Sequence, residues 1–170
     1  MDETRFWQLV EATRPDTGFT GQEAAERHIE ALAVALESVG PEDLIAFDRI
    51  FCRLHDAAYR WDLWGAAYLI ESGCSDDDFV YFRTGLIAQG REVYERALAD
   101  PETLAALPHV EDLVAYEEFA YVADEVYEQK TGAELPYLDD ELDQPGEPIG
   151  VPFDEDTVAD RFPRLAARFS

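Results

Sequence analysis

The sequence predicts a single all-α domain with an irregular multi-helix architecture, and three observations lead to that prediction. The chain has 170 residues, of which 47% are hydrophobic, and this is the length and composition of one domain with one packed core. Its apolar residues recur at intervals of three and four, the spacing of one helix face. No unit of about 20 to 50 residues recurs, which excludes a helical-repeat solenoid.

The first two predicted helices are delimited by turn and capping residues. The first spans residues 2–13 and ends before Pro15, because the residue preceding a proline avoids helical geometry. The second spans residues 20–39 and opens with a capping-box pattern, in which Thr20 and Glu23 each bond the other's backbone amide. The apolar positions that we expect these helices to bury are Phe6, Leu9, Val10, Ala25, Ile29, Leu32, Leu36 and Val39.

A third helix is predicted over residues 41–59, and we expect it to be the central helix of the core. Gly40 ends the preceding helix, and Pro41 suits a first turn. Its continuation into residues 61–70 is left open. That stretch is apolar nearly all round, which predicts a short buried helix. The core positions of the third helix are Leu44, Phe47, Ile50, Phe51, Leu54 and Ala58.

Further helices follow along the chain. Ser75 supplies a hydroxyl cap for a helix over residues 76–89, whose first turn is acidic. Residues 91–99 form a shorter helix, and residues 110–131 form one long helix that stops at Gly132. The positions that we expect to be buried in the helix of residues 76–89 are Phe79, Phe82, Leu86 and Ile87.

The C-terminal part of the chain has a different character. Residues 133–150 are acidic, contain prolines and lack a helical period, so we expect an extended segment. A short helix near residues 154–162 and a closing turn complete the chain. We therefore expect a helical core over residues 1–132 and a C-terminal segment over residues 133–170 that packs on it within the same domain. Its contacts with the core are expected from Leu135, Tyr137, Leu138, Leu142 and Ile149.

The chain is strongly acidic, and the acid is concentrated late in the sequence. It has 38 Asp and Glu against 13 Lys and Arg, a net charge of -25. A nucleic-acid backbone or an anionic membrane would repel it, so we expect neither as a partner. The late acid either keeps the protein soluble or attracts a basic protein partner by electrostatic steering. The residues of the candidate acidic partner face are Glu117, Glu118, Asp124 and Glu125.

Targeting and cofactor motifs are absent from the sequence. The acidic start does not resemble a secretory signal, and no apolar run approaches the roughly 20 residues of a membrane span. We therefore expect a cytoplasmic protein in which Cys52 and Cys74 stay as thiols. Motifs for phosphate cradles, dinucleotide binding, zinc or calcium do not occur, so no cofactor and no metal is predicted.

No catalytic residue can be assigned from the sequence. Cys52 and His55 are three positions apart on a predicted helix, a spacing that allows a nucleophile and its base. A cysteine in so apolar a helix is also an ordinary small core residue, and no glycine-rich turn beside it offers oxyanion donors. Carboxylate pairs cannot be singled out among 38 acids. The absence of a catalytic signature favours a non-enzymatic protein.

Aromatic and arginine residues are densest around residues 59–91. Two interpretations are open for this candidate binding cluster. Its arginines and aspartate can be paired within a packed core, or the cluster can form a cleft or partner surface, because Trp, Tyr and Arg dominate binding hot spots. The residues of the cluster are Trp61, Asp62, Trp64, Arg83 and Arg91.

Most of the chain resembles one family. The segments that carry the resemblance are Phe6 and Trp7, residues 59–70, residues 73–77, Phe79, Phe82, Arg83, residues 86–91, Asp100, Pro101, residues 116–118 and residues 162–165. They are similar to the uncharacterised bacterial family catalogued as domain of unknown function number 4240. The resemblance implies a small helical domain. It implies no activity and transfers no functional residue to this chain.

These observations favour a non-enzymatic, cytoplasmic protein-interaction module, such as a regulator, an adaptor or an immunity-like protein, with a basic protein as its partner. The alternative is a small-molecule-binding or enzymatic domain with a pocket near Trp61, Trp64 and Arg83. The oligomeric state is left open.

Overall fold

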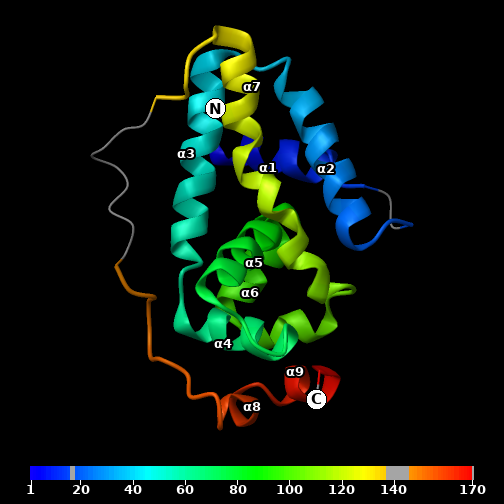
Figure 1. Ribbon diagram of the computed structural model, residues 1–170, viewed down its shortest axis with the longest axis vertical. Helices are drawn as coiled ribbons and strands as arrows, with labels where there is room; N and C mark the ends of the chain where they lie inside the picture. The colour runs from blue at the N-terminus through cyan, green and yellow to red at the C-terminus, as the bar shows by residue number, and fades with distance from the viewer. Residues whose placement is uncertain (16–17, 137–145, 170) are drawn as a thin grey trace.

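The computed structural model describes residues 1–15, 18–136 and 146–169, and these residues form helices joined by short connections (Figure 1). No strand occurs among them, so the predicted all-α class is confirmed. The elements, with η marking 3₁₀ helices, are α1 (Glu3–Ala12), α2 (Gly21–Leu36), α3 (Pro41–Ala57), α4 (Trp61–Ile70), α5 (Asp76–Ala88), α6 (Arg91–Ala99), η1 (Pro101–Ala106), η2 (Val110–Tyr121), α7 (Val122–Thr131), α8 (Val158–Arg161) and α9 (Pro163–Phe169).

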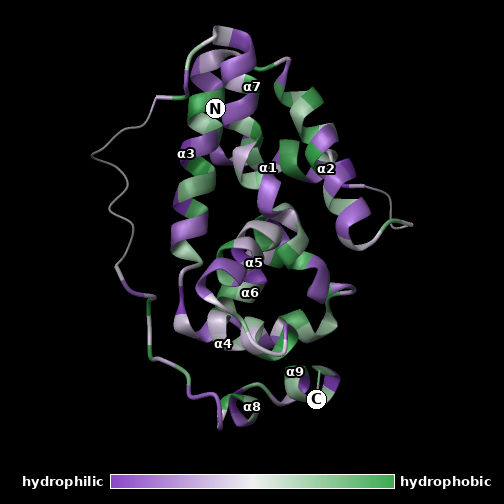
Figure 2. Ribbon diagram, viewed as in Figure 1, coloured by the Kyte–Doolittle hydropathy of each residue, from purple (hydrophilic) through white to green (hydrophobic). Residues whose placement is uncertain are grey.

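The helices form two groups around a continuous core. In the upper part of Figure 1, α7 packs beside α3 and α2, while α4, α5 and α6 lie below them. The 3₁₀ helix η2 joins the two groups, because it packs on both α2 and α5. Hydrophobic and hydrophilic residues alternate around the long helices, as the helical period requires (Figure 2). The core contains the fully buried rings of Phe6, Phe47, Phe79, Phe82 and Phe119.

One of the two capping predictions holds and the other is wrong. Ser75 caps α5 in a capping box: its Oγ accepts from the Asp78 amide at 3.2 Å, and Asp78 Oδ2 accepts from the Ser75 amide at 3.1 Å. Thr20 stands at the N-cap of α2 but makes no capping hydrogen bond. The adjacent amide, Gly21 N, instead donates to Asp112 Oδ2 at 2.6 Å, so a carboxylate from η2 supplies the acceptor.

The long helix predicted over residues 110–131 is wrong, because the structure divides it into η2 and α7. The backbone leaves helical geometry at Tyr116, with φ -94° and ψ 23°. Just before this point η2 passes very close to α5: an alanine Cβ at Gly85 would stand 2.1 Å from the carbonyl oxygen of Leu113. The two backbones are therefore in direct contact, and apolar spacing along the sequence does not record this packing.

Helices α3 and α4 are separate, which settles the continuation that the sequence left open. Between them Arg60 is extended, with φ -138° and ψ 139°. Here the chain pairs with a distant segment: Trp61 N donates to Ile149 O at 3.0 Å, and Ile149 N donates to Tyr59 O at 2.9 Å. These tertiary hydrogen bonds satisfy the backbone groups at the break.

Residues 146–169, which we call the C-terminal strap, run down one side of the molecule to its lower end, where α8 packs on α4 and α9 packs on α4 and η1 (Figure 1). An added Cβ on Gly65 of α4 would meet the side chains of Phe162 and Phe153 at 3.2 and 3.3 Å. The expected short helix is present as α8, but the expected closing turn is wrong, because those residues form the helix α9. The side chains of the strap that are buried in the core are Val158, Phe162 and Leu165.

The predicted contacts of the C-terminal segment are described only in part. Leu135 is buried, and Ile149 forms the backbone bridge although its side chain is 52% exposed. Tyr137, Leu138 and Leu142 lie outside the described residues. The division of the chain at residue 132 stays a prediction.

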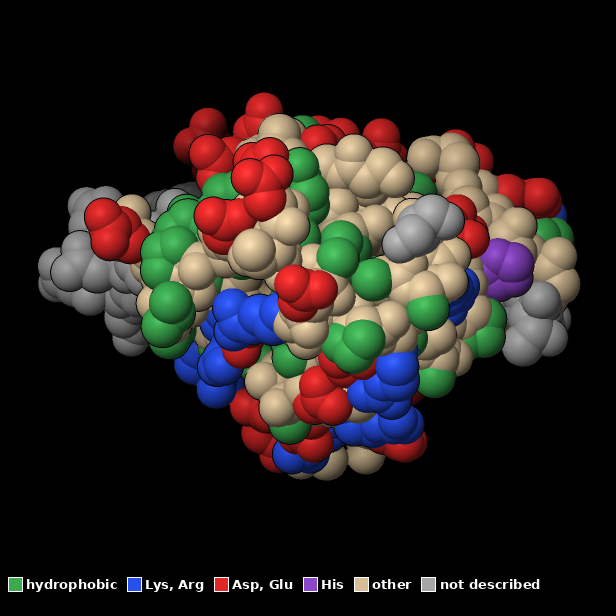
Figure 3. Space-filling view, turned by 90° about the horizontal axis from the view of Figure 1, so that it is seen from below, with side chains coloured by type: hydrophobic (Ala, Val, Ile, Leu, Met, Phe, Trp, Pro, Cys, Tyr) green, Lys and Arg blue, Asp and Glu red, His purple; other side chains and the backbone are tan. Residues whose placement is uncertain are grey.

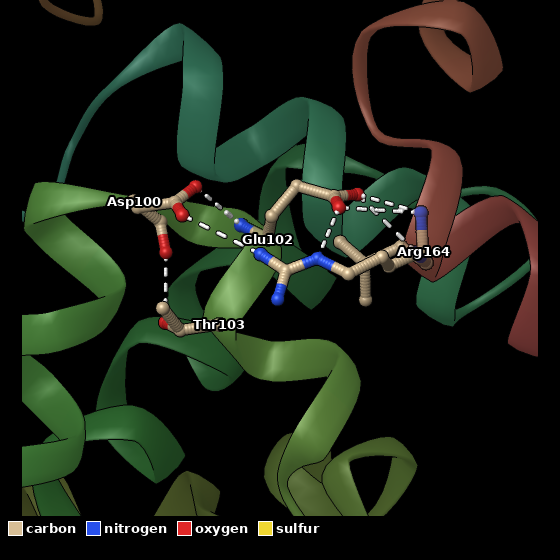
Figure 4. Close-up of polar contacts among 5 residues, drawn as sticks. Asp100, Glu102, Thr103 and Arg164 are labelled. Carbon is tan, nitrogen blue, oxygen red and sulfur yellow. Dashed lines mark hydrogen bonds and ion pairs between the residues drawn. The ribbon is translucent and has the colours of Figure 1, made fainter.

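A buried carboxylate anchors the strap (Figure 4). Glu102, only 9% exposed, accepts hydrogen bonds from the backbone amides of Arg164 and Leu165 at 3.1 and 3.3 Å. It also accepts from Arg164 Nε at 2.7 Å. The first amides of α9 thereby receive the anionic acceptor that a helix N-terminus lacks.

The structure also bears on membrane insertion. In the part of the chain that it describes, every helix is too short or too polar to span a bilayer.

Candidate functional site

Arg83 in α5 is the most unusual polar residue of the fold, because it is a buried cation held without an ion pair to any described carboxylate. Its side chain is 6% exposed. Nε donates to Phe79 O at 3.3 Å, and Nη1 donates to His55 O at 2.9 Å. The guanidinium carbon lies 4.7 Å from the centre of the Tyr59 ring and 5.1 Å from that of Phe79. Backbone carbonyls and ring faces thus hold the charge in place.

Arg83 lies beside a cleft between the end of α3 and the start of α5. We call it the Arg83 cleft; its volume is about 470 Å³. The two exposed carboxylates of Asp76 and Asp77 belong to the first turn of α5, and that of Asp56 comes from α3. The cleft therefore combines one buried cation with three carboxylates. Its lining residues are His55, Asp56, Tyr59, Asp76, Asp77, Val80, Arg83 and Gly146.

Burial shifts the pKa values of two titratable groups in the cleft, Arg83 and His55. Burial lowers the pKa of Arg83 to about 10, although Asp56 and Asp76 attract its charge. Burial also lowers the pKa of His55 to about 4, and the neighbouring Arg83 adds to this effect. His55 Nε2 lies 3.1 Å from Val80 O. The imidazole is therefore neutral near pH 7 and donates its proton to that carbonyl.

An aromatic stack lies beside the Arg83 cleft. The rings of Phe79 and Trp64 stack at 4.9 Å between centres, and those of Trp64 and Trp61 stack at 5.3 Å. Trp64 Nε1 donates to Cys74 O at 3.0 Å, and the edge of Trp61 meets Phe153 of the strap. Neither tryptophan lines the cleft. The stack supports the ring of Phe79, which in turn contacts Arg83.

The structure separates the five residues of the candidate binding cluster. Trp61 and Trp64 are in contact, and Arg83 faces the cleft. Asp62 pairs with Arg60 rather than with Arg83, at 3.0 and 2.9 Å from Nε and Nη2. Arg91 lies at another, open cleft of about 420 Å³, where its Nε donates to Glu95 at 2.7 Å. Sequence reasoning did not place Asp56, Asp76 and Asp77 beside Arg83, because their meeting depends on how α3 packs against α5.

The four residues of the acidic face lie at the junction of η2 and α7. All of them are exposed, and no ion pair joins any of them to a basic side chain among the described residues. A hydrogen bond to Glu117 raises the pKa of Tyr81, a residue of α5, so α5 adjoins this face. Asp124 Oδ1 accepts from the Leu135 amide at 3.3 Å. The residues of this face are Glu117, Glu118, Asp124 and Glu125.

Basic side chains are engaged elsewhere on the molecule. Seen from the end where α8 and α9 lie, they gather among acidic side chains (Figure 3). Arg164 there pairs with Glu102, and Arg168 donates to the carbonyls of Ala105 and Leu107. These arginines of the strap are thus used to attach it to η1 and the residues that follow it.

The two cysteines are free, and their surroundings do not activate them. Burial raises the pKa of Cys52 and of Cys74 to about 12. Cys52 Sγ lies 4.0 Å from Asp48 Oδ2, while the imidazole of His55 is bound to Val80 O. The nucleophile and base that the sequence allowed are therefore not arranged as a catalytic pair. In the part of the chain that is described, no group of three His, Cys, Asp or Glu side chains is placed to hold a metal.

His28 of α2 is fully buried in the core, away from the Arg83 cleft. Its Nε2 lies 2.9 Å from Val10 O, while Nδ1 has no partner among the described residues. The ring meets Tyr116 and Phe119 edge-on, at 5.9 and 5.2 Å between centres. Burial lowers the pKa of His28 to about 4, and the charge of Arg14 lowers it further.

We predict that His28 makes the protein less stable in acid. In the unfolded chain the imidazole regains a pKa near 6.5, so between pH 6.5 and 4 the unfolded state binds the proton first. The stabilisation by neutral His28 is full above this window. We expect it to fall by about 2 kcal/mol between about pH 6.5 and pH 4.5. Urea denaturation of the wild type and of His28→Gln across this range measures the difference, and parallel pH profiles would contradict the prediction.

Comparison with known proteins gives one match. A family model described as a protein of unknown function, DUF4240, matches residues 1–129. No curated protein and no solved structure matches the chain. The matched region contains the Arg83 cleft except Gly146, and it also contains the acidic face.

Proposed function

The chain belongs to the DUF4240 family, described as a protein of unknown function, and from its surface charges we propose that it is a non-enzymatic protein-interaction module. Its partner is a basic protein, which binds the acidic face formed by Glu117, Glu118, Asp124 and Glu125. We further propose that it acts in the cytoplasm, where the two free thiols would remain reduced.

The observation that carries this proposal is that the acidic face forms no ion pair with a cation of the described chain. Folding does not require four exposed carboxylates without ion pairs, because each can stay hydrated in the free protein. Some acids elsewhere on the surface do have basic partners, as Glu3 has in Arg53 at 2.8 Å, whereas this face gathers four carboxylates without one within residues 117–125. A basic protein would supply the cations that complement this face.

The overall charge strengthens the effect of this face. A net charge of -25 creates a negative potential that accelerates the approach of a basic protein and repels acidic ones. The face then aligns the encounter, because complementary charges favour one docking orientation. A regulator, an adaptor or an immunity-like protein that shields a basic enzyme would each use such a surface.

The test begins with native mass spectrometry of the protein recovered from its own host, which identifies a bound partner by its mass. Binding of the purified partner is then measured for wild type and for a variant with lysine at Glu117, Glu118, Asp124 and Glu125. We expect the variant to bind at least about tenfold more weakly, and the wild-type affinity to fall as salt rises.

A matched control separates the position of the charges from their number. Lysine at Glu26, Glu30, Glu37 and Glu42 changes the net charge by the same amount on α2, the turn after it and the start of α3, all at exposed positions. This control should bind within about threefold of wild type at physiological salt, where distant charges are screened. Equal losses in both variants would show that the acidic face has no specific role.

A second candidate function is small-molecule binding, and one observation favours it. The Arg83 cleft contains a buried cation that has no ion-paired counter-ion among the described residues. A ligand with an anionic group would supply one.

A further inference from the structure

We propose that the Arg83 cleft binds a free basic amino acid, with its carboxylate on the Arg83 guanidinium and its two cationic groups among Asp56, Asp76 and Asp77. This inference rests on the second candidate function, small-molecule binding, and it names the class of ligand. It is independent of the acidic face.

Arg83 has a hydrogen-bond donor that the described residues do not use. Nε and Nη1 donate to the carbonyls of Phe79 and His55, but Nη2 makes no hydrogen bond to a described residue. Arg83 is buried by the protein and lies at the wall of the cleft. Burying a cation without an anion is costly. A carboxylate that enters the cleft would bind this guanidinium with a charge-assisted hydrogen bond.

The carboxylates of the cleft lie near Arg83 but do not pair with it. Asp56 and Asp76 are near enough to attract the charge of Arg83, yet neither forms an ion pair with it. Arg83 and both aspartates line the same cleft of about 470 Å³. A ligand that contacts all of them must therefore be anionic where it meets Arg83 and cationic where it meets the aspartates.

The charges of the cleft select among ligand classes. One guanidinium faces three carboxylates, and His55 is neutral near pH 7 because its ring is buried and donates to Val80 O. Lysine and arginine carry one carboxylate and two cationic groups, which complements this set. An acidic metabolite would meet three like charges, whereas a diamine would leave Arg83 unpaired.

The shape of the cleft agrees with this class. Its volume lies within the usual range of small-molecule sites, roughly 300 to 1,000 Å³. Tyr59 and Val80 line it beside the charged groups. They offer apolar surface to the methylene chain that separates the two ends of a basic amino acid.

The experiment is a titration of the intact protein with L-lysine, followed by backbone amide NMR and by calorimetry. We compare cadaverine, which lacks the carboxylate, glutarate, which lacks cations, and glycerol, which is neutral. L-lysine should shift the amide signals at the start of α5 and the end of α3. It should bind about tenfold more tightly than cadaverine, because only lysine pairs with Arg83.

Two variants assign the contacts. Arg83→Gln should abolish the preference for L-lysine over cadaverine. Cadaverine should bind at least as tightly as it does to the wild type, because the variant removes a cation from the cleft, and this binding would show that the variant is folded. The double variant Asp76→Asn and Asp77→Asn changes only exposed residues and should weaken both ligands about tenfold. Its control, Glu26→Gln with Glu30→Gln, alters the net charge equally on α2 and should bind as the wild type does.

Three outcomes would overturn the inference, and they differ in what else they reject. If L-lysine binds no more tightly than cadaverine, the contact between the carboxylate and Arg83 is wrong. If glycerol or glutarate shifts the cleft signals and L-lysine does not, the ligand class is wrong but small-molecule binding stands. If no probe shifts the amide signal of any cleft residue at millimolar concentration, both the ligand class and small-molecule binding at this cleft are rejected.

Discussion

Replacing Gly85 with alanine should lower the free energy of unfolding by about 3 kcal/mol, although alanine is the better helix former. The reason is the contact between α5 and η2. The new Cβ would stand 2.1 Å from the carbonyl oxygen of Leu113 and 2.7 Å from its carbonyl carbon. These are backbone atoms, so no side chain can rotate away and the two helices must separate. Urea denaturation followed by tryptophan fluorescence measures the loss.

Gly40→Ala is the matched control for this substitution. Gly40 has φ -73° and ψ 158°, which alanine adopts easily, and among the described residues beyond its own neighbours in the chain no atom lies within 4 Å of the position that an alanine Cβ would take. Its effect should stay below about 1 kcal/mol. If Gly85→Ala cost no more than this control, α5 and η2 would not be in the contact that we describe.

Glu102→Ala should weaken the docking of the C-terminal strap on the helical core by about 3 kcal/mol. The substitution removes the acceptor of the Arg164 and Leu165 amides and of Arg164 Nε. It leaves the Leu165 amide unpaired beside the core, where Leu165 itself is fully buried. Hydrogen exchange should report faster exchange in α9, while the amides of α3 and α7 keep the protection of the wild type.

The control for Glu102 is an exposed glutamate that also pairs with arginine. Glu92 lies 3.6 Å from Arg96 with a side chain that is 84% exposed. Glu92→Ala should therefore cost less than about 0.5 kcal/mol. Protection of α9 that is unchanged in Glu102→Ala would show that apolar packing alone holds the strap.

The sequence predicts those features of the fold whose causes lie within a few residues. The capping box at Ser75 is predictable because both partners lie in one turn. At Thr20 no capping hydrogen bond forms, and Asp112, distant in sequence, is the acceptor for the adjacent Gly21 amide. The break within residues 110–131 escapes prediction because α-helices and 3₁₀ helices place apolar residues at similar intervals. The close contact of η2 with Gly85 of the facing helix is likewise not visible in the sequence of residues 110–131.

The candidate site is predictable in part for the same reason. Arg83 is identified from composition, since arginine among aromatic residues suggests binding or a paired core. Its neighbours are not, because the nearest acid in sequence to the tryptophans, Asp62, pairs locally with Arg60. The carboxylates beside Arg83 come from the end of one helix and the start of another. Their proximity is a property of tertiary packing, which apolar periodicity does not contain.

The strap has a consequence for the order in which the protein is made. The surface of α4 around Gly65 is synthesised long before Phe153 and Phe162, whose rings cover it in the folded protein. On the ribosome this apolar surface is therefore open while the remaining chain is translated. Contacts between residues far apart in the sequence form slowly, so we expect the strap to dock late in folding. Chaperone binding during synthesis should accordingly be concentrated on that helix.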